Sequence, residues 1–288
     1  MKTIKNDKSY KSGYIDVSDG HALYFELYGN PKGIPVLFLH GGPGAGFSDK
    51  DKQFFNKRIY NVIFFDQRGS SRSKPFGSIE HNTTQDLVRD INKILDYLGF
   101  DGIFVFGGSW GSSLALVYAI HHPERVKGLI LRGIWLANKY GLEHYINGGI
   151  KEFFPDVWER FAKLVPEGEN PVNYYLDKML SDDKKVSDKY AYEWAYYEMS
   201  FYTINKIADP DEIIKTFSYK SLAILEAHYI KNNCFLSEDF IMKNVDKIKN
   251  IDVSIVQGRY DFICPPSQAF RLHSGLKKSS LNITNAGH

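Results

Sequence analysis

Four short apolar runs constrain the fold of this chain more than any other feature of its sequence. They are the segments 34–39, 61–65, 103–106 and 126–131, and they contain almost no polar position. A strand with one solvated face would alternate polar and apolar residues, whereas a continuous apolar run is typical of a strand buried on both faces. Helical patterns separate the last three runs. The first of these helices is predicted to begin with a cap formed by Thr83 and Asp86 and to end at Gly99. The alternation predicts an α/β fold with a mostly parallel sheet.

The two ends of the chain extend the same pattern. Segments 14–17 and 21–28 form a predicted hairpin around a Ser-Asp-Gly turn. Near the other end, a strand at 253–257, a helix at about 267–276 and a last strand at 281–284 are predicted.

The middle of the chain differs from both ends. From Trp135 to Ile241 it carries long, aromatic-rich helical segments with proline breaks and no buried-strand signal. The sequence therefore predicts a core formed by residues 1–134 and 242–288. A helical cap, residues 135–241, is inserted after the sixth strand.

Charge and composition limit the partners of this protein. Thirty-six Lys and Arg residues against 34 Asp and Glu residues leave a net charge of +2, which argues against a dedicated nucleic-acid binder. The polar N-terminal segment lacks a signal-peptide pattern, and no apolar run is long enough to span a membrane. With two cysteines, Cys234 and Cys264, we expect reduced thiols and a cytoplasmic protein without membrane partners.

The most informative motif lies between the third apolar run and the helix that follows. Residues 107–111 read G-G-S-W-G, a G-x-S-x-G arrangement. Glycines on both sides of Ser109 allow a sharp strand-to-helix turn that lifts the hydroxyl out of the sheet. The same letters also fit an ordinary turn, but their position after a buried strand predicts that Ser109 is a catalytic nucleophile.

A serine nucleophile needs a histidine base that is oriented by a carboxylate, and this motif places both later in the chain, acid first. Asp261 follows the predicted strand 253–257, and His288 follows the last predicted strand. Asp261 and His288 are therefore the predicted partners of Ser109.

The oxyanion formed during acyl transfer needs fixed N–H donors. The amide of Trp110 follows the nucleophile directly, and the glycine-rich segment 41–46 offers a second amide, which we assign to Gly42. That segment fits neither a dinucleotide-binding fingerprint nor a phosphate-binding loop. The chain also lacks an HExxH motif or a Cys/His cluster, so neither a metal nor an organic cofactor is predicted.

Several motifs together resemble the proline iminopeptidases (prolyl aminopeptidases) of the α/β-hydrolase superfamily. They are the segments 40–44 (HGGPG), 66–73 (DQRGSSRS), 82–84 (NTT), 107–112 (GGSWGS), 194–198 (WAYYE) and 226–229 (EAHY). The last two are similar to W-x-x-W-E and E-N-H-Y in that family. The resemblance implies a serine aminopeptidase that releases proline from small peptides, with Glu198 and Glu226 holding the free N-terminal imino group.

The resemblance also implies the wall of a proline pocket. It assigns Arg132, Trp135 and Tyr145, at the entry to the cap, and Cys264, three residues after Asp261. Cys264 would then be a thiol accessible enough for alkylation to block substrate.

Two expectations remain open at this stage. Relatives continue past the position of His288, so we expect the chain as given to be truncated and impaired. The same fold and triad would also serve an esterase, amidase or lactonase, or a catalytically silent binding protein.

Overall fold

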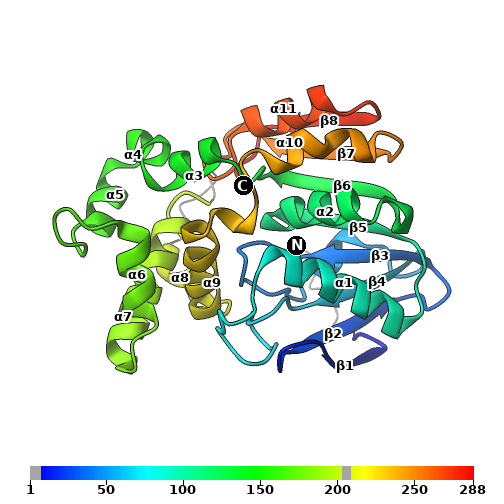
Figure 1. Ribbon diagram of the computed structural model, residues 1–288, viewed down its shortest axis with the longest axis horizontal. Helices are drawn as coiled ribbons and strands as arrows, with labels where there is room; N and C mark the ends of the chain where they lie inside the picture. Colours follow the sequence, from blue (N-terminus) through cyan, green and yellow to red (C-terminus); the bar gives the residue numbers. More distant parts are fainter. Residues whose placement is uncertain (1–7, 203–208) are drawn as a thin grey trace.

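The computed structural model describes residues 8–202 and 209–288, and its strands form one eight-stranded sheet in the order β1-β2-β4-β3-β5-β6-β7-β8 (Figure 1). The strands are β1 (Lys11–Asp16), β2 (Ala22–Gly29), β3 (Ile34–Leu39), β4 (Tyr60–Phe65), β5 (Ile103–Ser109), β6 (Val126–Ile134), β7 (Val253–Gly258) and β8 (Ser279–Thr284). Strand β2 is antiparallel to β1 and β4, and every other neighbouring pair is parallel. The predicted mostly parallel sheet is confirmed.

The apolar runs form the centre of this sheet. In β4, Val62, Ile63 and Phe64 have no exposed surface, although their side chains point alternately to opposite faces. Burial on both faces is the condition under which a strand reads as a continuous apolar run. Strand β3 has the bounds that the sequence predicted.

Helices cover both faces of the sheet. Those of the core are α1 (Thr84–Leu98), α2 (Trp110–His121), α10 (Phe240–Asn244) and α11 (Pro266–Gly275), with the 3₁₀ turns η1 (Asp51–Phe54), η2 (Pro123–Arg125) and η4 (Val245–Ile248). Helix α1 begins as predicted, with a capping box between Thr83 and Asp86, and ends at Gly99 in the left-handed conformation.

The segment between β6 and β7 folds as helices that extend to one side of the sheet (Figure 1). They are α3 (Lys139–Ile146), α4 (Gly149–Phe153), α5 (Pro155–Ala162), α6 (Pro171–Met179), α7 (Lys184–Met199), α8 (Pro210–Ile214), α9 (Tyr219–Lys231) and η3 (Asn233–Phe235). Aromatic rings fill their interior, as where Phe161 stacks on Tyr175 at 4.3 Å. We refer to residues 135–241 as the cap, although the proposed boundary at 241/242 falls inside α10.

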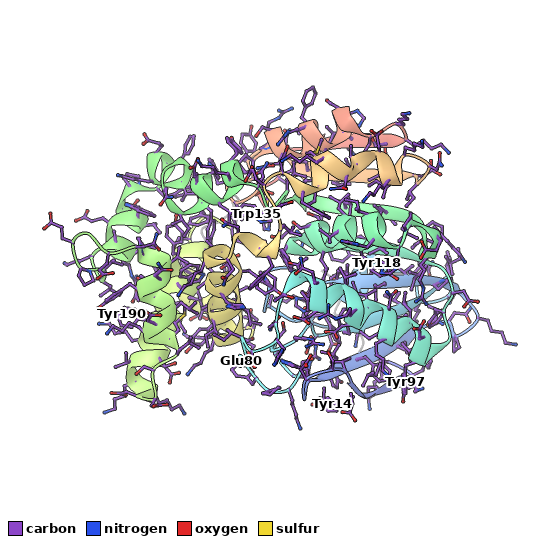
Figure 2. All side chains as sticks on the ribbon, in the orientation of Figure 1. Tyr14, Glu80, Tyr97, Tyr118, Trp135 and Tyr190 are labelled. Atoms are coloured by element: carbon purple, nitrogen blue, oxygen red, sulfur yellow. The ribbon has the colours of Figure 1, made fainter. Side chains whose placement is uncertain are left out.

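Helix α9 joins the cap to the core. The hydroxyl of Ser221 donates to the carbonyl oxygen of Gly44 at 2.8 Å and accepts from the amide of Ser71 at 3.1 Å. A Cβ on Gly44 would lie 2.3 Å from the backbone oxygen of Ser221, so only glycine permits this approach. Trp135, the first residue of the cap, also lies where the cap meets the core (Figure 2). Within the described part of the chain, no helix has the length and apolar character needed to cross a bilayer.

Candidate active site

Ser109 stands at a sharp turn between β5 and α2. Its backbone has φ 56° and ψ −127°, which is unfavourable for a residue with a side chain. A Cβ on Gly107 would lie 2.2 Å from the carbonyl oxygen of Gly111, and one on Gly111 would lie 2.1 Å from that of Leu39. The two flanking glycines are thus required by close backbone contacts, as the motif predicted.

Asp261 and His288 lie together at the ends of β7 and β8. The Nδ1 of His288 is 2.9 Å from Oδ2 and 3.0 Å from Oδ1 of Asp261, and both side chains are almost fully buried. Among the described residues, the His288 ring hydrogen-bonds to Asp261 but not to Ser109. An Asp–His contact of this kind fixes the ring and favours Nδ1 as the protonated nitrogen.

Asp261 is held by further donors on the same loop. Its Oδ1 accepts from the backbone amides of Ile263 at 3.1 Å and Cys264 at 2.8 Å. Its Oδ2 accepts from Nε2 of Gln257 at 3.0 Å. With His288 included, the carboxylate has four donors, which hold it in one orientation.

Gln257 was not predicted to belong to the site. Its side chain is fully buried, and besides Asp261 it contacts two backbone groups. Its Oε1 accepts from the amide of Ile134 at 2.9 Å, and its Nε2 also donates to the carbonyl of Cys264 at 2.9 Å. A glutamine at the end of the predicted strand 253–257 was the sequence signal that could have identified it, because a buried amide needs partners.

The glycine-rich segment after β3 is held by a buried histidine. The Nε2 of His40 accepts from the amide of Gln67 at 2.9 Å, so its Nδ1 donates to the carbonyl of Gly41, also at 2.9 Å. Burial lowers the pKa of His40, which keeps this tautomer neutral. Gly42, with φ 104°, follows directly, and together with Trp110 it lines the same pocket as Ser109.

Glu198 of α7 and Glu226 of α9 meet inside the cap. Each is 6% exposed, and their carboxyl groups hydrogen-bond to each other. The Oε2 of Glu226 accepts from Nε1 of Trp194 at 2.7 Å and from the hydroxyl of Tyr145 at 3.4 Å. The Oε2 of Glu198 is buried and has no hydrogen-bond partner among the described residues.

Burial and proximity change the protonation of this pair. Burial raises the pKa of Glu226 well above its usual range, and the charge of Glu198 raises it further. Burial also raises the pKa of Glu198. Two carboxylates in contact in a buried site cannot both stay ionised at little cost, so they share a proton. A shared proton leaves the pair with a single negative charge.

One pocket connects the cap with the nucleophile. Its lining includes the predicted residues Ser109, Gly42, Trp110, Trp135, Tyr145 and Glu226, and the residues Pro43, Tyr229, Ile230, Cys234 and Ile263, which were not predicted. Glu198, Arg132 and Cys264 are not part of that lining. Glu198 instead contacts Glu226, and the Arg132 guanidinium lies beside Gly108, where a Cβ would be 2.8 Å from it.

The structure changes the expectation for the cysteines. The thiol of Cys264 interacts with Ser109 but has no exposed surface, and burial raises its pKa well above the usual range. The expectation of an accessible thiol is therefore wrong, because the Cys264 side chain is completely buried. Cys234 is the cysteine that lines the pocket, and burial raises its pKa to about 12. Both cysteines are free, as predicted.

One group of potential metal ligands occurs within the described residues. Asp261, Cys264 and His288 offer ligand atoms within 4.8 Å of one another. The donors already bound to Asp261 occupy its carboxylate, however, and the buried thiol resists the ionisation that metal binding requires. The arrangement fits a hydrogen-bonded acid–base pair better than a metal site.

Comparison with known proteins finds a matching family and similar proteins over nearly the whole chain. Residues 34–288 match the family profile of the alpha/beta hydrolase fold. A proline iminopeptidase of Arabidopsis thaliana is 42% identical over 291 residues, covering 97% of this chain and 75% of that protein. One of Neisseria meningitidis serogroup B is 42% identical over 286 residues, covering 97% of this chain and 90% of that protein.

Solved structures agree on the fold at much lower identity. An esterase from Exiguobacterium antarcticum superposes with a TM-score of 0.66 at 21% identity, covering 96% of this chain and 92% of that one. The crystal structure of a proline iminopeptidase of Mycobacterium smegmatis gives a TM-score of 0.62 at 16% identity, covering 96% and 91%. The sheet is thus that of the predicted α/β-hydrolase fold.

Proposed function

We propose, since this chain belongs to the proline iminopeptidase family of the α/β-hydrolase superfamily, that it is a serine aminopeptidase that releases proline from the N-terminus of small peptides. The relatives named above support the activity, and the contacts within the pocket support the roles of individual residues.

In this proposal, the Oγ of Ser109 attacks the carbonyl carbon of the N-terminal residue while His288 accepts the hydroxyl proton. The amides of Gly42 and Trp110 donate to the oxyanion. His288 then protonates the leaving peptide nitrogen, and an acyl-enzyme forms. Water, deprotonated by His288, attacks this ester, and free proline leaves as Ser109 regains its proton. Asp261 orients the ring throughout.

The buried carboxyl pair is the observation that carries the proposal. Glu226 lines the pocket of Ser109, and Glu198 contacts Glu226. An aminopeptidase must recognise the cation of the residue whose carbonyl it attacks, and buried carboxylates bind a cation through strong charge-assisted hydrogen bonds. A neutral ester or lactone needs no such pair, and an unpaired buried acid is costly to maintain without a ligand.

The rest of the pocket fits a small apolar ring. Trp135 and Tyr145 meet edge to face at 6.4 Å and provide aromatic walls. The hydroxyl of Tyr145 reaches Glu226, so the apolar wall and the cation site are joined. We assign Arg132 and Cys264 to the support of Ser109, since the Arg132 side chain packs on Gly108, the residue before Ser109, and the Cys264 thiol interacts with Ser109 itself.

Two measurements on the purified protein test the proposal. Free proline should appear when a peptide that begins with proline is added, and a serine-directed phosphonate should label Ser109. A Ser109→Ala variant should lose both signals. Rapid cleavage of simple esters without proline release would identify a different hydrolase, and the absence of labelling would indicate a silent member of the family.

A further inference from the structure

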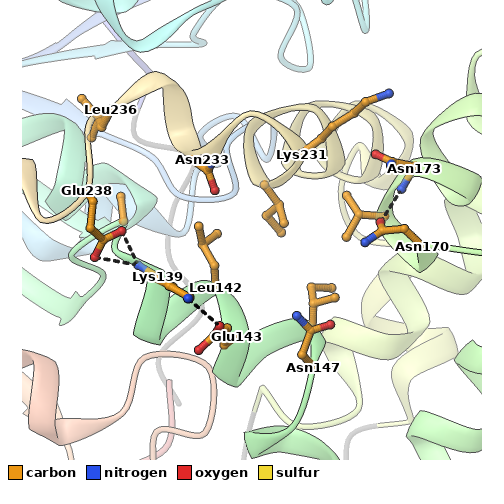
Figure 3. Close-up of a pocket in the computed structure, with 14 residues that line it drawn as sticks. Lys139, Leu142, Glu143, Asn147, Asn170, Asn173, Lys231, Asn233, Leu236 and Glu238 are labelled. Carbon is orange, nitrogen blue, oxygen red and sulfur yellow. Dashed lines mark hydrogen bonds and ion pairs between the residues drawn. The ribbon is translucent and has the colours of Figure 1, made fainter.

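Two places on the cap lie close enough to the proposed triad to influence it. One is a cavity of about 490 Å³ between α3, the start of α6 and the segment that follows α9 (Figure 3). Among the described residues that line it, none hydrogen-bonds to Asp261 or His288, and it shares only Ile230 with the pocket of Ser109. The other place is the segment that directly follows α7, and this segment contacts His288 itself.

Tyr202, three residues after the end of α7, lies against His288. The two rings meet at 69° with their centroids 5.4 Å apart, an arrangement that aromatic pairs favour. The backbone amide of His288 also donates to the carbonyl oxygen of Tyr202 at 3.2 Å. A residue of the cap therefore contacts both the ring and the main chain of the proposed general base.

The core holds the His288 imidazole from two other directions. The carboxylate of Asp261 meets Nδ1, as described above. At the end of β6, Gly133 has φ 53°, and a Cβ on it would lie 3.1 Å from Cε1 of the imidazole, so the ring packs close to bare backbone. Between these contacts and Tyr202, the side chain of His288 is only 3% exposed.

One hydrogen bond at Nδ1 does not fix the direction of the opposite nitrogen. The torsion between Cβ and the ring of a histidine has broad energy wells, so the imidazole can swing while it stays bonded to Asp261. Proton transfer from Ser109 requires Nε2 to come within hydrogen-bond distance of Oγ. Packing against the faces and edges of the ring must therefore limit that swing.

The segment that carries Tyr202 also belongs to the cation site. Glu198 lies four residues earlier, in the last turn of α7. Burial raises the pKa of Glu198, and a positive charge on His288 opposes that rise, so the two groups are near each other. Phe201 is 1% exposed and packs on Tyr145 of the pocket wall, with ring centroids 6.3 Å apart. This packing anchors the segment beside the pocket.

We propose that Tyr202 is a positioning residue for His288. Its ring limits the swing of the imidazole and keeps Nε2 directed towards Ser109, so the cap serves the general base as well as the recognition of a cation. The inference rests on the proposed function for the role of His288, but not on the identity of the substrate. Because the contact is one of ring packing, phenylalanine should replace Tyr202 and alanine should not.

Three variants test this role. Tyr202→Ala removes the ring, and Tyr202→Phe keeps it. Tyr190→Ala is the matched control, because Tyr190 is also half-buried in the cap and packs on two rings of α6. We expect Tyr202→Ala to lower kcat about 10-fold, with KM changed by less than about 2-fold, on a proline anilide and on phenyl acetate alike, since both reactions need the base. Tyr202→Phe should restore kcat, and Tyr190→Ala should leave it unchanged.

Proton NMR makes the test independent of turnover. The proton between Asp261 and His288 gives a downfield resonance, which broadens when a mobile ring lets it exchange with water. We expect Tyr202→Ala to broaden this resonance, whereas Tyr202→Phe and Tyr190→Ala should keep it sharp. If Tyr202→Ala does not fold, Tyr202→Leu retains the apolar bulk without the aromatic ring and should show the same losses to a smaller extent.

An unchanged resonance in Tyr202→Ala would overturn the inference, because any loss of kcat would then not act through the His288 ring. A loss confined to the anilide would overturn it as well, since Tyr202 would then contact substrate. An equal loss in Tyr190→Ala would show a general effect of the cap and would also reject it. Selective broadening in a protein that releases no proline supports the positioning role and counts against the proposed function alone.

Discussion

Replacing Glu226 with glutamine isolates the contribution of the carboxyl pair. Glutamine preserves the shape of the side chain and can donate to Glu198, much as a protonated glutamic acid does. It cannot ionise, so the negative charge of the pair is confined to Glu198, which does not line the pocket, and the side chain that faces a substrate cation is neutral. A hydrogen bond to a charged group in a buried site contributes about 1.5–3 kcal/mol. A loss of 2–3 kcal/mol corresponds to a decrease of about 30- to 150-fold in kcat/KM for a proline anilide.

The assay needs a control for folding and one for the catalytic machinery. Glu193→Gln lies on α7, the helix that carries Glu198, where Glu193 pairs with Arg160 at 2.7 Å, and it should leave kcat/KM unchanged. Phenyl acetate, a neutral ester, reports on Ser109 and His288 without a cation. We expect Glu226→Gln to hydrolyse phenyl acetate like the unaltered protein. A loss of less than 3-fold on the anilide, or an equal loss on both substrates, would refute the role of the pair.

The Glu226→Gln variant should also change how the stability of the protein depends on pH. The pKa of Glu226 is raised in the folded state, so folding is favoured below the unfolded value of 4.5, and that advantage is lost as the pH rises through the raised folded pKa. Glutamine does not ionise. The free energy of unfolding of Glu226→Gln relative to the unaltered protein should therefore be higher at pH 8 than at pH 5. Denaturant titrations that show the same difference at both pH values would contradict this reasoning.

Three further predictions concern other parts of the site. Gln257→Glu places a second carboxylate beside Asp261 and should lower kcat at least 10-fold with little change in KM. The control Gln53→Glu, on the surface, should leave kcat unchanged. An unchanged kcat and pH profile for Gln257→Glu would show that Gln257 only fills space. Gly111→Ala should lower the melting temperature through its clash with the backbone of Leu39, and Gly148→Ala, which meets nothing within 4 Å, serves as its control. Neither cysteine should react with a thiol reagent until the protein unfolds, so rapid labelling of the native protein would contradict the burial of Cys264 and Cys234.

The sequence predicted most of the sheet because local physics determines it. Runs such as 34–39 can be buried only as inner strands, and the Thr83–Asp86 capping box and Gly99 set the ends of α1 without help from tertiary contacts. Ser109 was identifiable for the same reason, since its conformation depends on glycines adjacent in the chain.

Other features depend on contacts between distant segments and could not be read from spacing. Cys234 lines the pocket from a left-handed turn after α9, whereas Cys264, three residues after Asp261, is completely buried. Gln257 acquires its role from Ile134, which is more than a hundred residues away in the chain. Glu198 and Glu226 could be selected by resemblance, but their contact depends on how α7 packs against α9.

The rate of hydrolysis of a proline anilide relative to its N-acetylated form tests the central claim most directly. Acetylation removes the positive charge and leaves the scissile bond and the proline ring in place. The account predicts that the anilide with the free secondary amine is hydrolysed at least 100-fold faster, because desolvating the carboxyl pair without a cation forfeits a charged contact worth about 3 kcal/mol. Comparable rates on the two compounds would show that the pair does not select the chain end.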